Sequence, residues 1–155
     1  MSYEMISEKM FFPINGNPQK VWKRIWQIGG NNGWYYDTKL WKIRGFLDKL
    51  AGGIGYRKGR RDPNNIYEGD PIDFWRVVIA DATSQTLRLK AEMKLPGEVF
   101  IQWEIKQNQL LQTIEFFPNS MMGKIYWFLV RPLHYWIFYQ MGKRITSPQY
   151  MKSPH

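Results

Sequence analysis

Apolar and polar residues alternate along two stretches in the second half of the chain, residues 86–95 and 98–107. Leucine, alanine and methionine fall on one face of the first stretch, and valine, isoleucine and tryptophan fall on one face of the second. Lysine, arginine, glutamate and glutamine fall on the opposite faces. A period of two is typical of a strand whose sheet has one buried and one solvated face. Residues 74–82 and 110–118 are two further candidate strands, and short turn signals separate the four. The pattern predicts an antiparallel sheet with one face that must be covered.

The first part of the chain predicts a strand followed by a helix. Residues 3–14 alternate loosely and end at the turn signal Asn15–Gly16. Asn17 is the expected N-cap of the helix, with Pro18 in its first turn, and Gly29–Gly30 ends it. The apolar residues of this helix share one face: Val21, Trp22, Ile25 and Trp26.

The segment Gly29–Asp37, GGNNGWYYD, joins this helix to a second one. Asp37 is the expected N-cap of the second helix, and Gly52–Gly53 ends it. The loop has neither the Rossmann pattern nor the Walker pattern, so phosphate binding has no motif behind it. It is either a helix–helix turn whose glycines supply positive φ, or a turn in which Trp34 and Tyr35 also form part of a cavity mouth.

Residues 121–145 form a long apolar segment that could be mistaken for a membrane span. Lys124 and Arg131 interrupt it, and each cation at the bilayer centre would cost about 2.5–3.5 kcal/mol. Pro132 would kink a helix there. We therefore predict a long helix that lies on the sheet and does not cross a membrane.

This order of elements, with four blocks of sequence, resembles an uncharacterised family of the START-like, helix-grip superfamily. The resemblance runs from about Pro18 to Ile145, and its blocks are GGNNGWYYDTKLWKIRGFLDKLAGGIGYRKGRRD, GDPIDFWRV, LKAEMKLPG and GKIYWFLVRPLHYWIF. It implies an α+β fold: a curved antiparallel sheet of six or seven strands, two short helices and a long C-terminal helix over the sheet. We expect one domain over residues 1–145 and a flexible tail over 146–155.

The resemblance also implies a cavity between sheet and helix that takes an apolar ligand, but it supplies no catalytic or binding residues. Members of the family usually follow an NAD(P)-binding, short-chain-dehydrogenase-like domain, which these 155 residues do not contain. We therefore expect no cofactor held by this chain. A separately encoded NAD(P)-binding protein is one candidate partner.

The inward rows of the predicted sheet give the expected cavity walls. Trp75, Val77, Leu89, Met93, Ile101 and Trp103 would line the cavity, and Tyr126, Leu129 and Ile137 of the last helix would close it. The alternative is that aromatic side chains fill this space and leave a solid core. Asp73 or Glu115 would be a candidate acid or ligand anchor if either faced the cavity beside Trp75. The complete set of cavity candidates is Trp34, Tyr35, Asp73, Trp75, Met93, Trp103, Glu115, Tyr126 and His134.

Catalytic and metal-binding patterns do not emerge from the sequence. The chain has two histidines and no cysteine, and it lacks a nucleophile elbow. We expect no metal, and we interpret His134 as a hydrogen-bonded core or rim residue rather than a general base. The absence of cysteine and of a signal-peptide pattern favours the cytoplasm.

Basic residues outnumber acidic ones, giving a formal net charge of +9, which suggests an acidic partner. Arg57, Arg60 and Arg61 form a basic run and are the candidate anion-binding residues. The alternative is that nearby carboxylates such as Asp62 and Asp70 neutralise this run. Nucleic-acid binding is not expected, because no recognition motif is present.

Three functions follow from these observations. The first is a domain that binds a small apolar ligand without catalysis. The second is an enzyme of the cyclase, isomerase or hydrolase type, or an accessory to a reductase. The third is a peripheral membrane or interaction module that uses the basic second helix and exposed aromatic residues. We favour the first.

Overall fold

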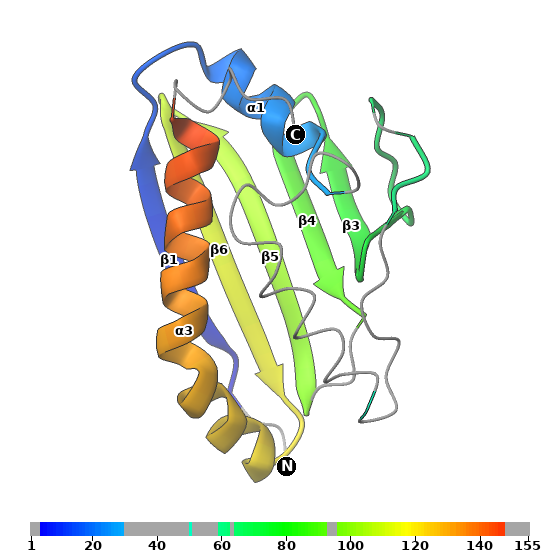
Figure 1. The fold of residues 1–155 in the computed structure, drawn as a ribbon, viewed down its shortest axis with the longest axis vertical. Coiled ribbons are helices and arrows are strands. Elements are labelled where there is room, and N and C mark those ends of the chain that lie inside the picture. Colours follow the sequence, from blue (N-terminus) through cyan, green and yellow to red (C-terminus); the bar gives the residue numbers. More distant parts are fainter. Residues whose placement is uncertain (1–3, 30–49, 51–58, 63, 93–95, 148–155) are drawn as a thin grey trace.

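The computed structural model describes residues 4–29, 50, 59–62, 64–92 and 96–147, which form a six-stranded antiparallel sheet and two helices (Figure 1). The predicted α+β, helix-grip fold is confirmed. The strands are β1 (Ile6–Pro13), β2 (Pro71–Ile72), β3 (Trp75–Asp81), β4 (Thr86–Ala91), β5 (Gly97–Lys106) and β6 (Gln109–Pro118), and the helices are α1 (Pro18–Trp26) and α3 (Met121–Thr146).

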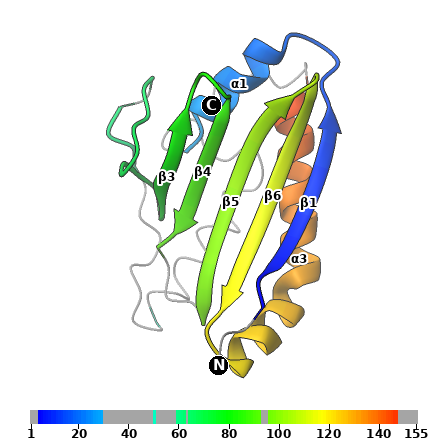
Figure 2. The same cartoon turned by 180° about the vertical axis from the view of Figure 1, so that it is seen from behind.

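The strand order across the sheet is β1-β6-β5-β4-β3-β2, with every neighbouring pair antiparallel. Strands β2 to β6 follow one another as a meander, while β1, from the start of the chain, pairs with β6 and forms an edge (Figure 2). A bulge between Val77 and Ile79 of β3 was not predicted from the sequence.

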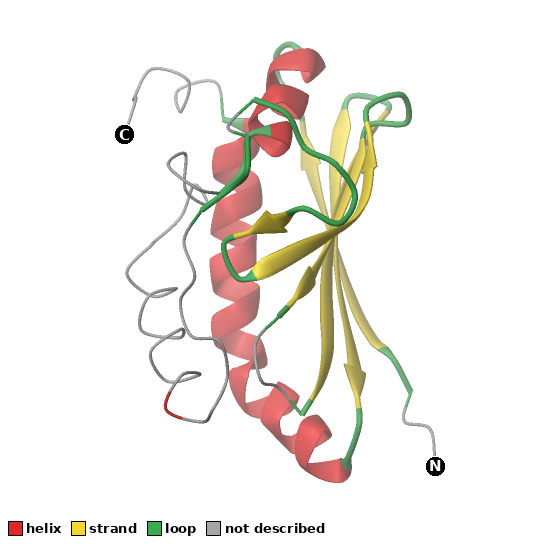
Figure 3. Cartoon of the chain, turned by 90° about the vertical axis from the view of Figure 1, so that its right-hand side faces the viewer, coloured by secondary structure: helices red, strands yellow, loops and turns green. Residues whose placement is uncertain are grey.

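The long helix α3 covers one side of the sheet, packing along β6 and β1 (Figures 1 and 3). This confirms the helix predicted over 121–145 and its place on the buried face. The helix continues through Pro132. Pro132 cannot donate to the carbonyl of Phe128, but both residues are exposed, so water can bond that carbonyl.

The short helix α1 begins as the sequence predicts. Asn17 is its N-cap, and the Asn17 side chain accepts a hydrogen bond of 2.9 Å from the amide of Gln19. Gly29 has a positive φ of 84°, as expected for the glycine that ends the helix. The predicted second helix and most of the loop before it lie outside the described residues.

Arg24 of α1 ties the two helices together. Its guanidinium donates to the carbonyls of Ile145 and Ser147, the latter at 2.8 Å, at the C-terminal end of α3. The last carbonyls of a helix have no partner within the helix and carry partial negative charge, so a cation stabilises this end. Arg24 therefore has a structural role, because it joins α1 to the C-terminal end of α3.

Candidate functional site

Two rows of side chains run across the inner face of the sheet from β3 to β1. Cross-strand pairing places their members side by side. The first row is Ala80, Leu87, Trp103, Gln112 and Met10, and the second is Val77, Leu89, Ile101, Ile114 and Glu8. Each row is apolar over β3, β4 and β5, and each holds one polar side chain on β6 or β1, the strands along which α3 packs.

Gln112 is the polar member of the first row and is fully buried. Its Oε1 accepts a hydrogen bond of 2.8 Å from Nε1 of Trp103, and its Nε2 donates at 2.8 Å to the carbonyl of Phe138 in α3. Because a buried amide is costly unless it is bonded, this network fixes how α3 sits on β5 and β6. Sequence reasoning missed Gln112, although a polar residue at an inward position of a period-two strand was the available signal.

We predict that Trp103→Phe lowers the free energy of unfolding by about 1–2 kcal/mol more than Trp127→Phe does. Both tryptophans are almost fully buried, but Nε1 of Trp127 has no hydrogen-bond partner among the described residues. Only the first change leaves a buried acceptor, Oε1 of Gln112, without its donor. Urea unfolding of both variants measures the difference, and equal losses would refute the role given to this network.

Glu8 is the polar member of the second row. It lies almost buried on β1 and forms an ion pair with Arg131 of α3. This ion pair attaches the edge strand β1 to α3. Neither residue was a sequence candidate, because β1 alternates only loosely and Arg131 interrupts an apolar helix.

The predicted cavity walls are tightly packed. Trp75 is 2% exposed, while Leu89, Ile101 and Trp103 are each 0% exposed. A cavity large enough for a water molecule would leave accessible surface on its lining residues. No water-sized cavity therefore borders these four side chains.

The two candidate carboxylates do not meet at this interior. Asp73 is buried in the turn before β3, has a positive φ of 52°, and accepts a hydrogen bond of 2.7 Å from the amide of Gly59. Glu115 was a candidate only if it faced the cavity, and it does not. It lies on the outer face of the sheet, where it pairs with Arg88 at 2.6 Å, because its neighbours in β6 point inward.

The candidates on α3 divide between its two sides. His134 is half-buried, and its ring lies 5.6 Å from that of Trp127 and 6.0 Å from that of Phe138. Tyr126 is half-buried and Ile137 is buried. Leu129 was wrongly expected to face the sheet, because it is 77% exposed on the opposite side of the helix. Trp34, Tyr35 and Met93 lie outside the described residues.

Arg60 does not present its guanidinium to an anion. It donates to the carbonyls of Trp26 at 2.8 Å and Ile28 at 3.0 Å, and also to those of Asp62 and Asn65. These contacts stabilise the C-terminal end of α1 and the loop beyond it. The candidate role of Arg60 as an anion site is therefore corrected to a structural one.

Arg61 is paired as the alternative interpretation expected. It bonds both carboxylate oxygens of Asp70, at 3.1 and 3.2 Å, and its guanidinium lies 4.8 Å from the ring centre of Tyr67. The hydrogen bond to Asp70 raises the pKa of Arg61. The amide of Asn64 holds the pKa of Asp62 below its ordinary value. Arg57, the third candidate, lies outside the described residues.

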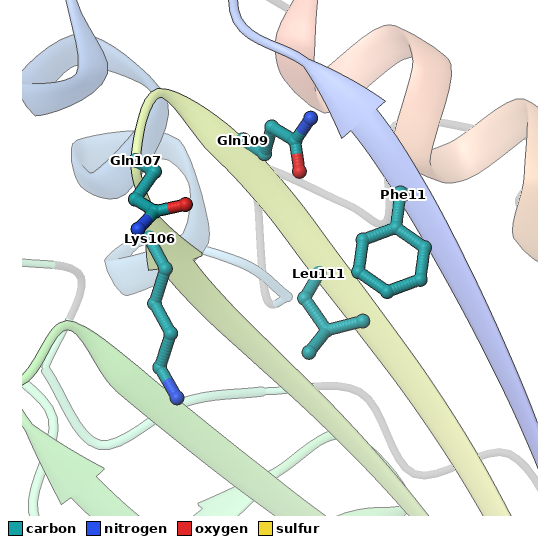
Figure 4. A pocket seen from close by; sticks show the side chains of 5 residues that line it. All are labelled: Phe11, Lys106, Gln107, Gln109 and Leu111. Atoms are coloured by element: carbon teal, nitrogen blue, oxygen red, sulfur yellow. The ribbon is translucent and has the colours of Figure 1, made fainter.

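The surface hollows that described residues line include two large ones. One, of about 530 Å³, lies on the outer face near the β5–β6 turn, where Phe11 and Leu111 lie side by side with Lys106, Gln107 and Gln109 (Figure 4). The other, of about 580 Å³, is a groove where β1 meets α3 beside Glu8 and Arg131. Within the described residues, no three histidine or carboxylate side chains come close enough to hold a metal ion.

An antiparallel sheet wrapped around a long C-terminal helix defines the helix-grip class, and solved structures of this class match the chain. The ginseng major latex-like protein 151 from Panax ginseng matches with a TM-score of 0.54 at 9% identity, over 92% of this chain and 95% of that one. The truncated norcoclaurine synthase from Thalictrum flavum matches with a TM-score of 0.51 at 9% identity, over 94% and 92%. At this identity the likeness shows the fold alone.

The chain belongs to the DUF2867 family, described as a protein of unknown function, whose model matches residues 8–141. No curated protein matches the chain.

Proposed function

We propose that this chain binds a small apolar ligand between the inner face of the sheet and α3. The observation that carries the proposal is the pair of inner rows, which are apolar over β3 to β5 and end in Gln112 and Glu8 under α3. Ligand sites combine apolar walls, which provide affinity, with a few polar groups that fix orientation. The apolar body of the ligand would lie over the first part of each row, with a polar group near Gln112.

Because the inner side chains are closely packed, binding requires them to move apart. A ligand that binds only the open arrangement shifts the population toward it and loses some affinity to the cost of opening. The proposal therefore expects weak binding of small probes and tighter binding of a ligand that fills the whole space. Delivery of that ligand to a separately encoded NAD(P)-dependent reductase is a further proposal, based on the sequence resemblance alone.

The test compares two aromatic probes that differ by one hydroxyl, naphthalene and 2-naphthol, in titration calorimetry. We expect Gln112→Leu to raise the Kd of 2-naphthol about tenfold, because the hydroxyl loses its hydrogen-bond partner. The Kd of naphthalene should change by less than about twofold.

Thr113→Val is the matched control. Thr113 is also a buried polar residue of β6, but it is the next residue along the strand and points to the outer face. It should leave both dissociation constants unchanged. If the protein binds neither probe, or if Thr113→Val weakens 2-naphthol as much as Gln112→Leu does, the proposed site is wrong.

A further inference from the structure

One side of α3 lies against the sheet and the other faces away from it (Figure 3). The side that faces away carries many exposed apolar residues. Leu129 is 77% exposed, Met122 68% and Phe128 65%. The exposed large apolar residues of this helix, called here the outer face of α3, are Met121, Met122, Ile125, Phe128, Leu129, Leu133, Tyr135, Trp136 and Tyr139. A soluble domain rarely exposes so continuous an apolar surface unless it meets a partner.

The basic residues of α3 lie mainly at the borders of this face. At 100° per residue, the outer face spans an arc of about 160°, and the sheet-facing residues occupy the opposite arc. Lys124 and Arg131 lie at one border of the outer face and Arg144 at the other, with Lys143 near its C-terminal end. Residues 121–146 contain no aspartate or glutamate.

A second copy of the chain is a poor partner for this face. Pairing two α3 helices would bring the cations of both copies together, and α3 carries no carboxylate of its own, although Arg131 is paired with Glu8 of β1. The whole chain carries a formal net charge of +9, which adds to the repulsion.

An anionic bilayer matches both the apolar arc and the charge. Helices that lie in the membrane interface combine an apolar face with lysine and arginine along its borders. Long cationic side chains at the border reach the headgroups, and Trp136, Tyr135 and Tyr139 are of the type enriched at interfaces. Within the described residues, no helix is long and apolar enough to cross a membrane.

We propose that the outer face of α3 docks on the surface of a membrane containing anionic lipid, with the helix parallel to the bilayer plane. This differs from the sequence-based hypothesis, which gave the membrane role to the basic second helix. It concerns a different surface from the ligand site, because the most exposed residues of the outer face, Met122, Phe128 and Leu129, point away from the inner rows.

The test is co-sedimentation with vesicles of 70% phosphatidylcholine and 30% phosphatidylglycerol, compared with phosphatidylcholine alone. We expect the partition coefficient to be at least about tenfold higher on the anionic vesicles and to fall as salt is raised. Phe128→Glu should lower the partition coefficient about tenfold or more, because a charge replaces an aromatic side chain that the bilayer would bury.

Phe11→Glu is the matched control. Phe11 is 62% exposed, close to the value for Phe128, but lies on the outer face of the sheet, and the substitution changes net charge by the same amount. It should reduce binding only modestly. Equal losses from both variants, or no binding of the unchanged protein, would overturn the proposal. So would a dimer in light scattering that Phe128→Glu converts to a monomer, because a second copy would then cover this face.

Discussion

Replacing Gly142 with alanine is expected to lower the free energy of unfolding by about 2–3 kcal/mol, the cost of overpacking a tight core. Gly142 is buried in α3 and faces β1. A Cβ built at this position would overlap the ring of Phe12, which is itself buried. The better helix propensity of alanine offsets about 1 kcal/mol at most, so the helix must move away from the edge strand. Thermal or urea unfolding measures the loss.

A second-site change tests the cause. Phe12→Leu should recover part of the stability lost in Gly142→Ala, because it removes the atoms that the new methyl group meets. Gly16→Ala is the control, since a Cβ at Gly16 meets nothing within 4 Å. If Gly142→Ala is as harmless as Gly16→Ala, α3 does not approach β1 as closely as described.

Replacing Arg131 with methionine is expected to cost about 2–3 kcal/mol. Glu8 would then keep its charge in an almost buried position without its partner, and removal of one partner of a buried pair typically costs about 3–5 kcal/mol. The arginine side chain is 47% exposed, while that of Glu8 is 8% exposed. Solvent screening on the arginine side reduces the expected value.

The double variant Glu8→Gln with Arg131→Met should be more stable than Arg131→Met alone, because position 8 then carries no buried charge without a partner. Lys143→Met is a control that removes a cation from the same helix, near the exposed Tyr139 ring. It should change stability by less than about 0.5 kcal/mol. A double variant no more stable than the single one would show that the ion pair does not hold β1 to α3.

The sheet was largely predictable from the sequence because β4 and β5 alternate clearly, and Trp75, Leu89 and Trp103 lie inward as expected. Glu115 was harder to place, because β6 carries apolar residues on both faces. Phe116 is fully buried, whereas its neighbour Phe117 is 36% exposed. Hydrophobicity alone did not show which residues of β6 face inward. Strict counting of alternate positions would have put Glu115 on the outer face of the sheet.

The orientation of α3 could not be predicted for a related reason. The helix is apolar all round, so its sequence does not mark which side faces the sheet. Leu129 and Ile137 were both expected to face the sheet, yet Ile137 is buried and Leu129 is exposed. Particular contacts fix which side of α3 faces the sheet. They are the stacking of Trp127 on Phe116, with ring centres 4.7 Å apart, and the hydrogen bond from Gln112 to the carbonyl of Phe138.

Packing of the interior was also beyond sequence reasoning. The spacing of residues predicts which side chains face inward, but it carries no measure of the volume left between them. The hydrogen-bond partners of the arginines were also not predictable from the sequence. Arg24 and Arg60 bond to carbonyls near helix ends that are distant in sequence, and a run of basic residues does not reveal such partners.

The most direct test of ligand binding is native mass spectrometry of the freshly purified full chain, alongside solvent extraction and mass spectrometry of the extract. The proposal predicts a small molecule with an apolar body and a polar group, bound one to one, retained in Thr113→Val and depleted in Gln112→Leu. A chain that carries no such molecule, and whose thermal stability no apolar compound raises, would contradict it. The packed interior would then be a structural core.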